Sequence, residues 1–273
     1  MPTTYTHYRF GKDVLSVLPN RIQQSIEKNR ELFDIGLHGP DILFYYNIFS
    51  SNSVSKKGVI LHEEPAESFF LRSKEVIEKI QDKAAARAYM YGVICHFALD
   101  SECHPYIEKM IQVSGISHSE IEMELDRYLM LEDQLIPTKN TRVEHVKPTK
   151  KNANIIAPFY EGVSTEKIRK ALKSMIWCHK VLAADNKGKE ELIYKALQLA
   201  GKYDEFQGLV MGREANTACE NYCILLKKVY EEAVPLAVDC ILQYQKLLSQ
   251  GESLPKRFKE TFGAGENWEN LQL

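Results

Sequence analysis

Apolar residues recur at intervals of three and four along most of the chain, which is the period of an amphipathic α-helix. This period runs through residues 11–33, where Pro19 interrupts it and indicates one or two helices. The period returns after Pro65, and it appears again in two later segments, residues 164–186 and 188–200. These segments predict a helical protein.

Near the carboxyl end, the same period covers residues 213–250, and Pro235 predicts a bend within that helix. The sequence contains no run of alternating apolar and polar residues, no glycine-rich phosphate loop and no internal repeat. We therefore expect an all-α fold, a single-domain bundle of about eight helices over residues 1–250. A loosely ordered C-terminal tail, residues 251–273, is expected to follow.

The strongest helical signal lies at residues 83–103, which contain many good helix formers and no proline. Pro105 disfavours helical backbone at the residue before it, so this helix is expected to end at His104. Ser117 and the glutamate three residues later form the pattern of a capping box. That pattern predicts that the next helix starts at His118.

Two polar stretches predict loops. Residues 51–58 are rich in serine, and residues 136–160 form the longest irregular stretch of the chain. The second stretch contains a basic segment, residues 139–151. Its composition favours a solvated loop over a contact with an anionic surface.

The composition, with 44% hydrophobic and 26% charged residues, is typical of a soluble globular domain. The formal net charge is only -2, so no overall field draws the protein to nucleic acid or to a membrane. The first residues lack the basic and apolar regions of a signal peptide, and no apolar run reaches the roughly 18 residues of a membrane span. We therefore expect a cytoplasmic protein whose six cysteines are buried and reduced.

Histidines and carboxylates recur at metal-ligand spacing. His96, Asp100 and His104 follow one another at steps of four, and His118 and Glu122 form a second such pair. A helix advances about 100° per residue, so residues four apart share one face. An imidazole and a carboxylate buried on an apolar face without partners would cost several kcal/mol, and a bound metal would remove that cost. The pattern therefore favours a metal cluster over a network of hydrogen bonds.

Eight residues in the first half of the chain are candidate ligands: His7, Asp41, His62, His96, Asp100, His104, His118 and Glu122. Nitrogen and oxygen ligands without cysteine suit zinc, with manganese or iron as alternatives. Eight ligands exceed the needs of one tetrahedral ion, so we expect a cluster of two or three zinc ions in which Asp100 could bridge two. His145 and His179 are expected to have no ligand role.

The segments THYRFG, GPD, CHFALDSECHP and SHSEIEMELDRYL, together with His62, resemble the zinc-dependent phospholipase C family over residues 1–135. This family shares its helical fold with fungal single-strand nucleases. The resemblance implies a phosphodiesterase that uses zinc to activate water for attack on a phospholipid or a related small phosphodiester.

By this resemblance, the zinc ions have three ligand sets: Asp41, His62, His96 and Asp100; His104, His118 and Glu122; and His7 and Asp100 with the amino terminus of the chain. Either the amine of Pro2, exposed by loss of Met1, or the side chain of His38 would complete the third set. The family's mechanism assigns Asp41 to orient or deprotonate the attacking water.

Two alternatives stay open beside this activity. A single-strand nuclease or nucleotidase on the same cluster is favoured if the basic segment at residues 139–151 borders the site. A non-enzymatic helical protein would hold structural metals, each closed by four protein ligands.

Overall fold

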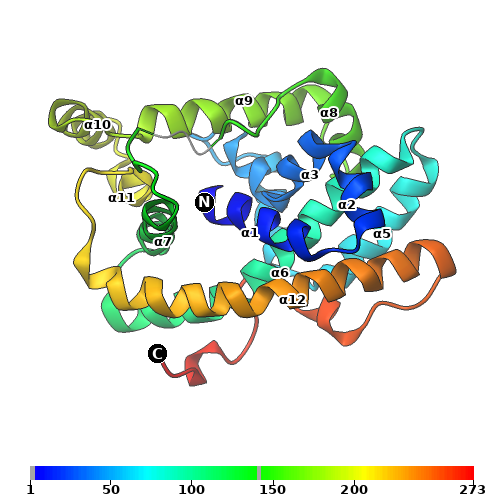
Figure 1. Ribbon diagram of the computed structural model, residues 1–273. Helices are drawn as coiled ribbons and strands as arrows, with labels where there is room; N and C mark the ends of the chain where they lie inside the picture. The colour runs from blue at the N-terminus through cyan, green and yellow to red at the C-terminus, as the bar shows by residue number, and fades with distance from the viewer. Residues whose placement is uncertain (1–3, 140–142) are drawn as a thin grey trace.

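The computed structural model of the chain describes residues 4–139 and 143–273, and these residues fold almost entirely into helices (Figure 1). The described part contains twelve α-helices: α1 (Thr4–Val17), α2 (Asn20–Glu27), α3 (Arg30–Gly36), α4 (Ser53–Glu63), α5 (Ala66–Lys79), α6 (Lys83–Ser114), α7 (His118–Glu132), α8 (Lys150–Ile156), α9 (Thr165–Leu182), α10 (Lys187–Leu199), α11 (Tyr203–Phe206) and α12 (Glu220–Gln250). It also contains six 3-10 helices: η1 (Gly39–Tyr45), η2 (Ala157–Phe159), η3 (Gln207–Leu209), η4 (Thr217–Cys219), η5 (Lys256–Lys259) and η6 (Trp268–Asn270). No strand occurs in these residues, so the predicted all-α, single-domain fold is confirmed, with more helices than expected.

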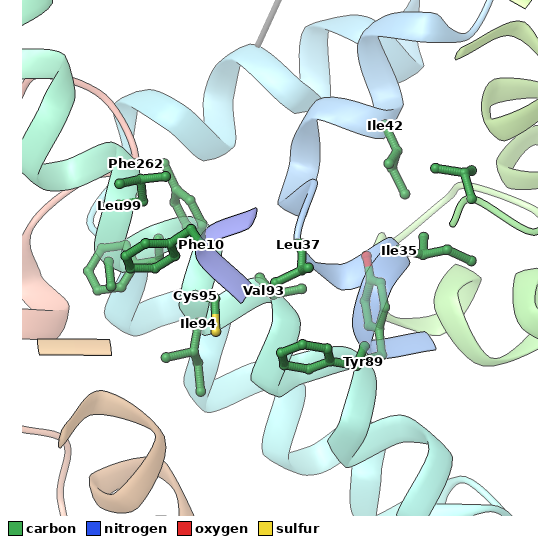
Figure 2. Close-up of a cluster of buried hydrophobic side chains, with 14 of the residues drawn as sticks. Phe10, Ile35, Leu37, Ile42, Tyr89, Val93, Ile94, Cys95, Leu99 and Phe262 are labelled. Carbon is green, nitrogen blue, oxygen red and sulfur yellow. The ribbon is translucent and has the colours of Figure 1, made fainter. Parts of the chain in front are cut away.

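Helix α6 forms the centre of the fold. Asp82 caps its start by accepting a hydrogen bond from the Ala85 amide at 3.0 Å, and Gly115 ends it in the left-handed conformation with φ 73°. Every residue from Tyr89 to Leu99 is buried, which is typical of a helix enclosed by others. Helices α3 and α12 pack against it, and Figure 2 shows apolar side chains of α3 and α6 meeting in the core.

Helix α3 crosses α6 in direct backbone contact through two glycines. A Cβ atom added to Gly36 would lie 2.2 Å from the carbonyl oxygen of Tyr89, and one added to Gly92 would lie 2.2 Å from the carbonyl oxygen of Phe33. Only glycine allows this approach. The crossing holds η1, which follows α3 in the chain, against the middle of α6.

Helix α6 continues through Pro105 to Ser114, so the predicted end at His104 is wrong. Proline inside a helix removes one hydrogen bond and crowds the preceding turn, at a cost of about 3 kcal/mol. The helix continues because Ile107 and Met110 on the following turns are buried, and their burial offsets that cost. His104 therefore stays in helical register with the two predicted ligands before it.

The predicted loop at residues 51–58 is also wrong, because α4 starts inside it. Asn52 caps that helix by accepting hydrogen bonds from the amides of Val54 and Ser55 at 2.9 and 3.1 Å. A polar stretch therefore served as a helix start rather than as a loop. In the same way, α8 and η2 interrupt the predicted irregular stretch at residues 136–160.

The expected C-terminal helices are present as α9, α10 and α12, with Pro235 inside α12. The residues after α12 are not the loose tail that we expected. Phe258 and Phe262 are 0% and 1% exposed, and their rings pack against Phe70 of α5 and Phe97 of α6. The chain thus returns to the central helix near its carboxyl end.

Among the described helices, none combines the length and the apolar character that crossing a membrane requires. All six cysteines are buried with free thiols, as expected.

Candidate metal centre

Four buried side chains converge in a first group: His7 from α1, Asp41 from η1, and His96 and Asp100 from α6. One ligand atom of each lies within 4.8 Å of the others. His7 Nε2 is 3.1 Å from Asp100 Oδ1, while His96 Nε2 is 3.0 Å from Asp100 Oδ2. The distance from His96 Nε2 to Asp41 Oδ2 is 3.5 Å. Nitrogen and oxygen atoms at these separations could share a metal ion.

A second group adjoins the first and contains His104 from α6 with His118 and Glu122 from α7. Glu122 Oε1 lies 3.5 Å from His104 Nε2 and 3.2 Å from His118 Nε2. Asp100 Oδ2 of the first group is 3.9 Å from His104 Nε2. The carboxylate of Asp100 therefore links the two groups.

Six buried atoms of these groups have no hydrogen-bond partner within the described residues: His7 Nδ1, His96 Nδ1, His96 Nε2, Asp41 Oδ2, Asp100 Oδ2 and Glu122 Oε2. Each unpaired buried polar atom costs about 1–3 kcal/mol. His96 Nε2 and Asp100 Oδ2 are only 3.0 Å apart, yet they are not aligned for a hydrogen bond. A cation between such atoms would satisfy them, so the residues fit a bound metal.

Helix α1, which carries His7, is held by a carboxylate of α7. Asp126 accepts hydrogen bonds from the amides of Thr4, Tyr5 and Thr6 at 3.2, 3.2 and 2.7 Å. The first amides of a helix have no partner within it, and a negative charge there suits the helix dipole. Asp126 thereby fixes the helix turn that places His7 beside α6.

Gly39 allows η1 to approach the imidazole of His96. Its φ is +46°, and a Cβ atom at this position would lie 2.2 Å from His96 Cδ2. Both the backbone conformation and the lack of space therefore require glycine. The close approach brings Asp41, two residues later, to the first group.

Two histidines at the centre are oriented by backbone carbonyls. His62 Nδ1 lies 2.7 Å from the oxygen of Gly58, and His104 Nδ1 lies 2.8 Å from the oxygen of Phe262. Each carbonyl keeps a proton on Nδ1 and turns Nε2 toward the carboxylates, as is usual for metal-binding histidines. His62 Nε2 is 2.9 Å from Asp41 Oδ1.

In the first group, neighbouring opposite charges shift the pKa values more than burial does. Burial alone would raise the pKa of Asp100, but the imidazoles of His96, His104 and His7 hold this pKa well below its usual range. Burial would lower the pKa of His7, but the carboxylates of Asp100 and Asp41 raise it. Asp100 is therefore an anion at neutral pH, which is the state that binds metal.

In the second group, too, neighbouring opposite charges shift the pKa values more than burial does. Burial would lower the pKa of His118, but Glu122 and Glu108 raise it to about 10. Glu108 Oε1 lies 3.4 Å from His118 Nδ1. Burial would raise the pKa of Glu122, but His118 and His104 lower it. A metal that binds His118 at neutral pH must therefore displace a proton.

A cavity of about 270 Å³ opens onto both groups. The residues that line it come from five regions of the chain: Asp41, Phe44, His62, Asp100, His104, Glu108, His118, Glu122, Gly263 and Ala264. The candidate ligands therefore have an open side, whereas a structural metal site is closed by protein ligands.

Seven of the eight candidate ligands lie in the two groups, and the eighth, His62, lies beside Asp41. His7 lies in the first group together with Asp100, its expected partner. The amino-terminal residues considered for a third ligand set lie outside the described residues.

The remaining histidines belong to neither group. His38, the other residue considered for the third set, has its Nε2 atom 2.7 Å from His145 Nε2. Burial and the neighbouring His145 lower the pKa of His38 well below its usual value. His179 Nε2 lies 2.7 Å from the hydroxyl of Thr4 in the first turn of α1.

Three residues that contact or position the candidate ligands were not identified from the sequence. Glu108 follows His104 by four residues, and Asp126 follows Glu122 by four, so one more step of the ligand spacing would have indicated both. Phe262 contributes a backbone carbonyl from the far end of the chain. No local sequence pattern marks such a contact.

The model of the family described as zinc dependent phospholipase C matches residues 6–176 of the chain. No curated protein and no solved structure matches the chain. The family match reaches past residue 135, where the sequence resemblance ended, and stops inside α9. Since the match covers more than half of the chain and every candidate ligand, the chain belongs to the zinc dependent phospholipase C family.

Proposed function

We propose that this protein is a zinc-dependent phosphodiesterase of the phospholipase C type, which hydrolyses a phospholipid or a related small phosphodiester. One observation carries the proposal: two groups of buried nitrogen and oxygen atoms, linked by Asp100, face one open cavity. The open side favours a catalytic centre over structural metals, because a catalytic metal keeps a coordination position free for water.

Two or three zinc ions would be held by the eight predicted ligands: His7, Asp41, His62, His96, Asp100, His104, His118 and Glu122. Asp100 would serve more than one ion, since Oδ2 lies 3.0 Å from His96 Nε2 and 3.9 Å from His104 Nε2. Its other oxygen is 3.1 Å from His7 Nε2, which provides a ligand pair for a third ion.

Zinc, when bound, lowers the pKa of water and offsets the negative charge of a phosphate group. Asp41 borders the cavity, so its carboxylate can reach a water molecule there. We assign it to orient or deprotonate the attacking water. His62 Nε2 lies 2.9 Å from Asp41 Oδ1, so these two side chains could hold the same zinc ion.

A single-strand nuclease would need contacts to the nucleic acid backbone beside the site. The basic segment at residues 139–151 was the candidate for such contacts, but none of its described residues lines the cavity. Residues 140–142 of this segment lie outside the described part. A phospholipid or small phosphodiester therefore remains the first choice of substrate.

The test is to measure the zinc content of protein purified without added metal or chelator, together with hydrolysis of a chromogenic phosphodiester before and after chelation. We expect two or three zinc ions per chain and turnover that chelation abolishes and zinc restores. Hydrolysis of short-chain phospholipids and of single-stranded DNA by the same sample then ranks the two substrate classes.

Each negative outcome has a distinct meaning. A chain with bound zinc but no turnover would support structural metals. A chain without zinc and without turnover after zinc is restored would refute the proposed function.

A further inference from the structure

We propose that the C-terminal segment, residues 260–264, positions the zinc ligands through its backbone. This inference rests on the proposed zinc centre. The segment lies outside the family match, which ends at residue 176, so membership of the family assigns it no role. It reaches the centre because the chain after α12 returns to the central helix, as the red end of the ribbon in Figure 1 shows.

The first contact orients His104. The carbonyl oxygen of Phe262 lies 2.8 Å from His104 Nδ1, and both residues are buried. A histidine that donates from Nδ1 has its Nε2 atom free to bind metal. His104 Nε2 in turn lies 3.5 Å from Glu122 Oε1 and 3.9 Å from Asp100 Oδ2. The carbonyl thus turns His104 toward the two carboxylates that join the ligand groups.

The second contact holds the segment to the helix that carries His62. The amide of Gly263 donates a hydrogen bond to the carbonyl oxygen of His62 at 3.0 Å. Three residues earlier, the carbonyl oxygen of Glu260 accepts one from the amide of Ala66 at 2.9 Å. These bonds attach the segment to the end of α4 and the start of α5, and Gly263 and Ala264 form part of the cavity wall.

The position of the Phe262 carbonyl depends on the buried Phe262 ring. The centre of this ring is 5.8 Å from that of His96 and 5.9 Å from that of His62. It also packs edge-on against Phe97 of α6 at 5.2 Å. One side chain therefore fixes the carbonyl relative to His96 of the first group and to His62.

Groups that hydrogen-bond to metal-binding histidines typically contribute about tenfold to hundredfold in metal affinity. The contribution of this segment is made by backbone atoms, so it needs a buried anchor rather than a polar side chain. This is why we expect substitution of Phe262, an apolar residue, to alter zinc binding.

The test compares Phe262→Ala and the milder Phe262→Leu with the matched controls Phe258→Ala and Phe258→Leu. Phe258 is equally buried and packs on Phe70 and Phe97 as Phe262 does, but among the described residues no ring contact joins it to a candidate histidine. Zinc affinity is measured by competition with a chromophoric chelator. The Nδ1 proton of His104 is followed by nuclear magnetic resonance in the zinc-loaded full-length protein.

We expect Phe262→Ala to weaken binding of at least one zinc ion by about tenfold to hundredfold and to speed exchange of the His104 Nδ1 proton with solvent. Phe262→Leu should give a smaller change of the same kind and covers the case that Phe262→Ala does not fold. The Phe258 variants should lower the unfolding temperature but leave zinc affinity and proton exchange unchanged.

Wild-type zinc affinity and proton exchange in both Phe262 variants would overturn this inference alone. Equal losses in the Phe258 variants would also overturn it, because the segment would then have only a structural role. A wild-type protein that binds no zinc would remove the proposed function as well.

Discussion

Asp41 is the residue on which the proposed chemistry depends most directly. Asp41→Asn keeps an oxygen that can bind metal but removes the charge that accepts a proton. We expect the variant to retain its zinc content and to lose about 10²- to 10⁴-fold in hydrolysis rate. Zinc content and turnover of a chromogenic phosphodiester are measured on the same sample, with the exposed Asp185→Asn as the control. Unchanged turnover would exclude the assigned role of Asp41.

The raised pKa of His118 predicts a pH effect on stability in zinc-free protein. Its pKa is about 10 in the folded chain, against an ordinary value of 6.5. The folded state therefore binds a proton that the unfolded state releases, and the resulting stability is complete below pH 6.5 and disappears as the pH rises through 10. Thermal unfolding of chelated protein should show a steeper loss over this range in the wild type than in His118→Gln. Parallel curves would contradict the assigned pKa.

Ligand spacing could identify most of the centre because its residues lie on helices in regular register. His96, Asp100 and His104 share one stripe of α6, and their spacing alone places them together. What spacing could not provide is the arrangement between elements. Whether His7 or His62 lies nearest to Asp41 and Asp100 depends on how α1 and α4 pack against α6. That packing is fixed by contacts such as those of Asp126, which are distant in sequence.

At the scale of elements, helices with strong apolar periods were predicted well and their boundaries less well. Pro105 has a strong local preference against helix, yet α6 continues because the turns beyond it are buried. The start of α4 at Ser53 depends on a cap that composition alone does not distinguish from a loop. For α6 the stabilisation comes from burial against elements that are distant in sequence, which a local pattern does not contain. For α4 it comes from the local cap of Asn52, which the polar composition of the stretch concealed.

The crossing of α3 and α6 predicts that Gly92→Ala disturbs the metal centre at a distance. The added Cβ atom would overlap the backbone of α3 and push this helix, and η1 after it, away from α6. Overpacking of this kind costs about 1–3 kcal/mol. We expect a lower unfolding temperature and weaker zinc binding, because Asp41 moves away from His96. Differential scanning calorimetry and zinc titration measure the two effects.

Gly188→Ala is the matched control for this substitution. Gly188 also lies in a helix, but a Cβ atom there would meet its nearest neighbour at an ordinary 3.5 Å. Alanine favours a helix more than glycine does, so the control should be neutral or slightly stabilising. A Gly92→Ala protein that matches this control in stability and zinc binding would show that α3 and η1 can shift without cost.

At the scale of the whole molecule, the centre joins elements that are far apart in sequence. The candidate ligands come from α1, η1, α4, α6 and α7, and the C-terminal segment contacts three of these ligands: His62, His96 and His104. The family match contains the ligands but not this last segment. Bound zinc would therefore connect both ends of the chain to the central helix.

This arrangement predicts that zinc stabilises the entire fold. A ligand that binds only the folded state adds about 2.7 kcal/mol per site to the free energy of unfolding at a hundredfold excess over its dissociation constant. The unfolding temperature should therefore rise on addition of zinc to chelated protein. Glu122→Ala removes the oxygen ligands of that side chain from the second group and should reduce this rise, whereas the exposed Glu266→Ala should not. An equal rise in both variants would show that the second group does not hold zinc. In that case the stabilisation would come from the first group alone, and the carbonyl of Phe262 would orient a histidine without a metal to bind.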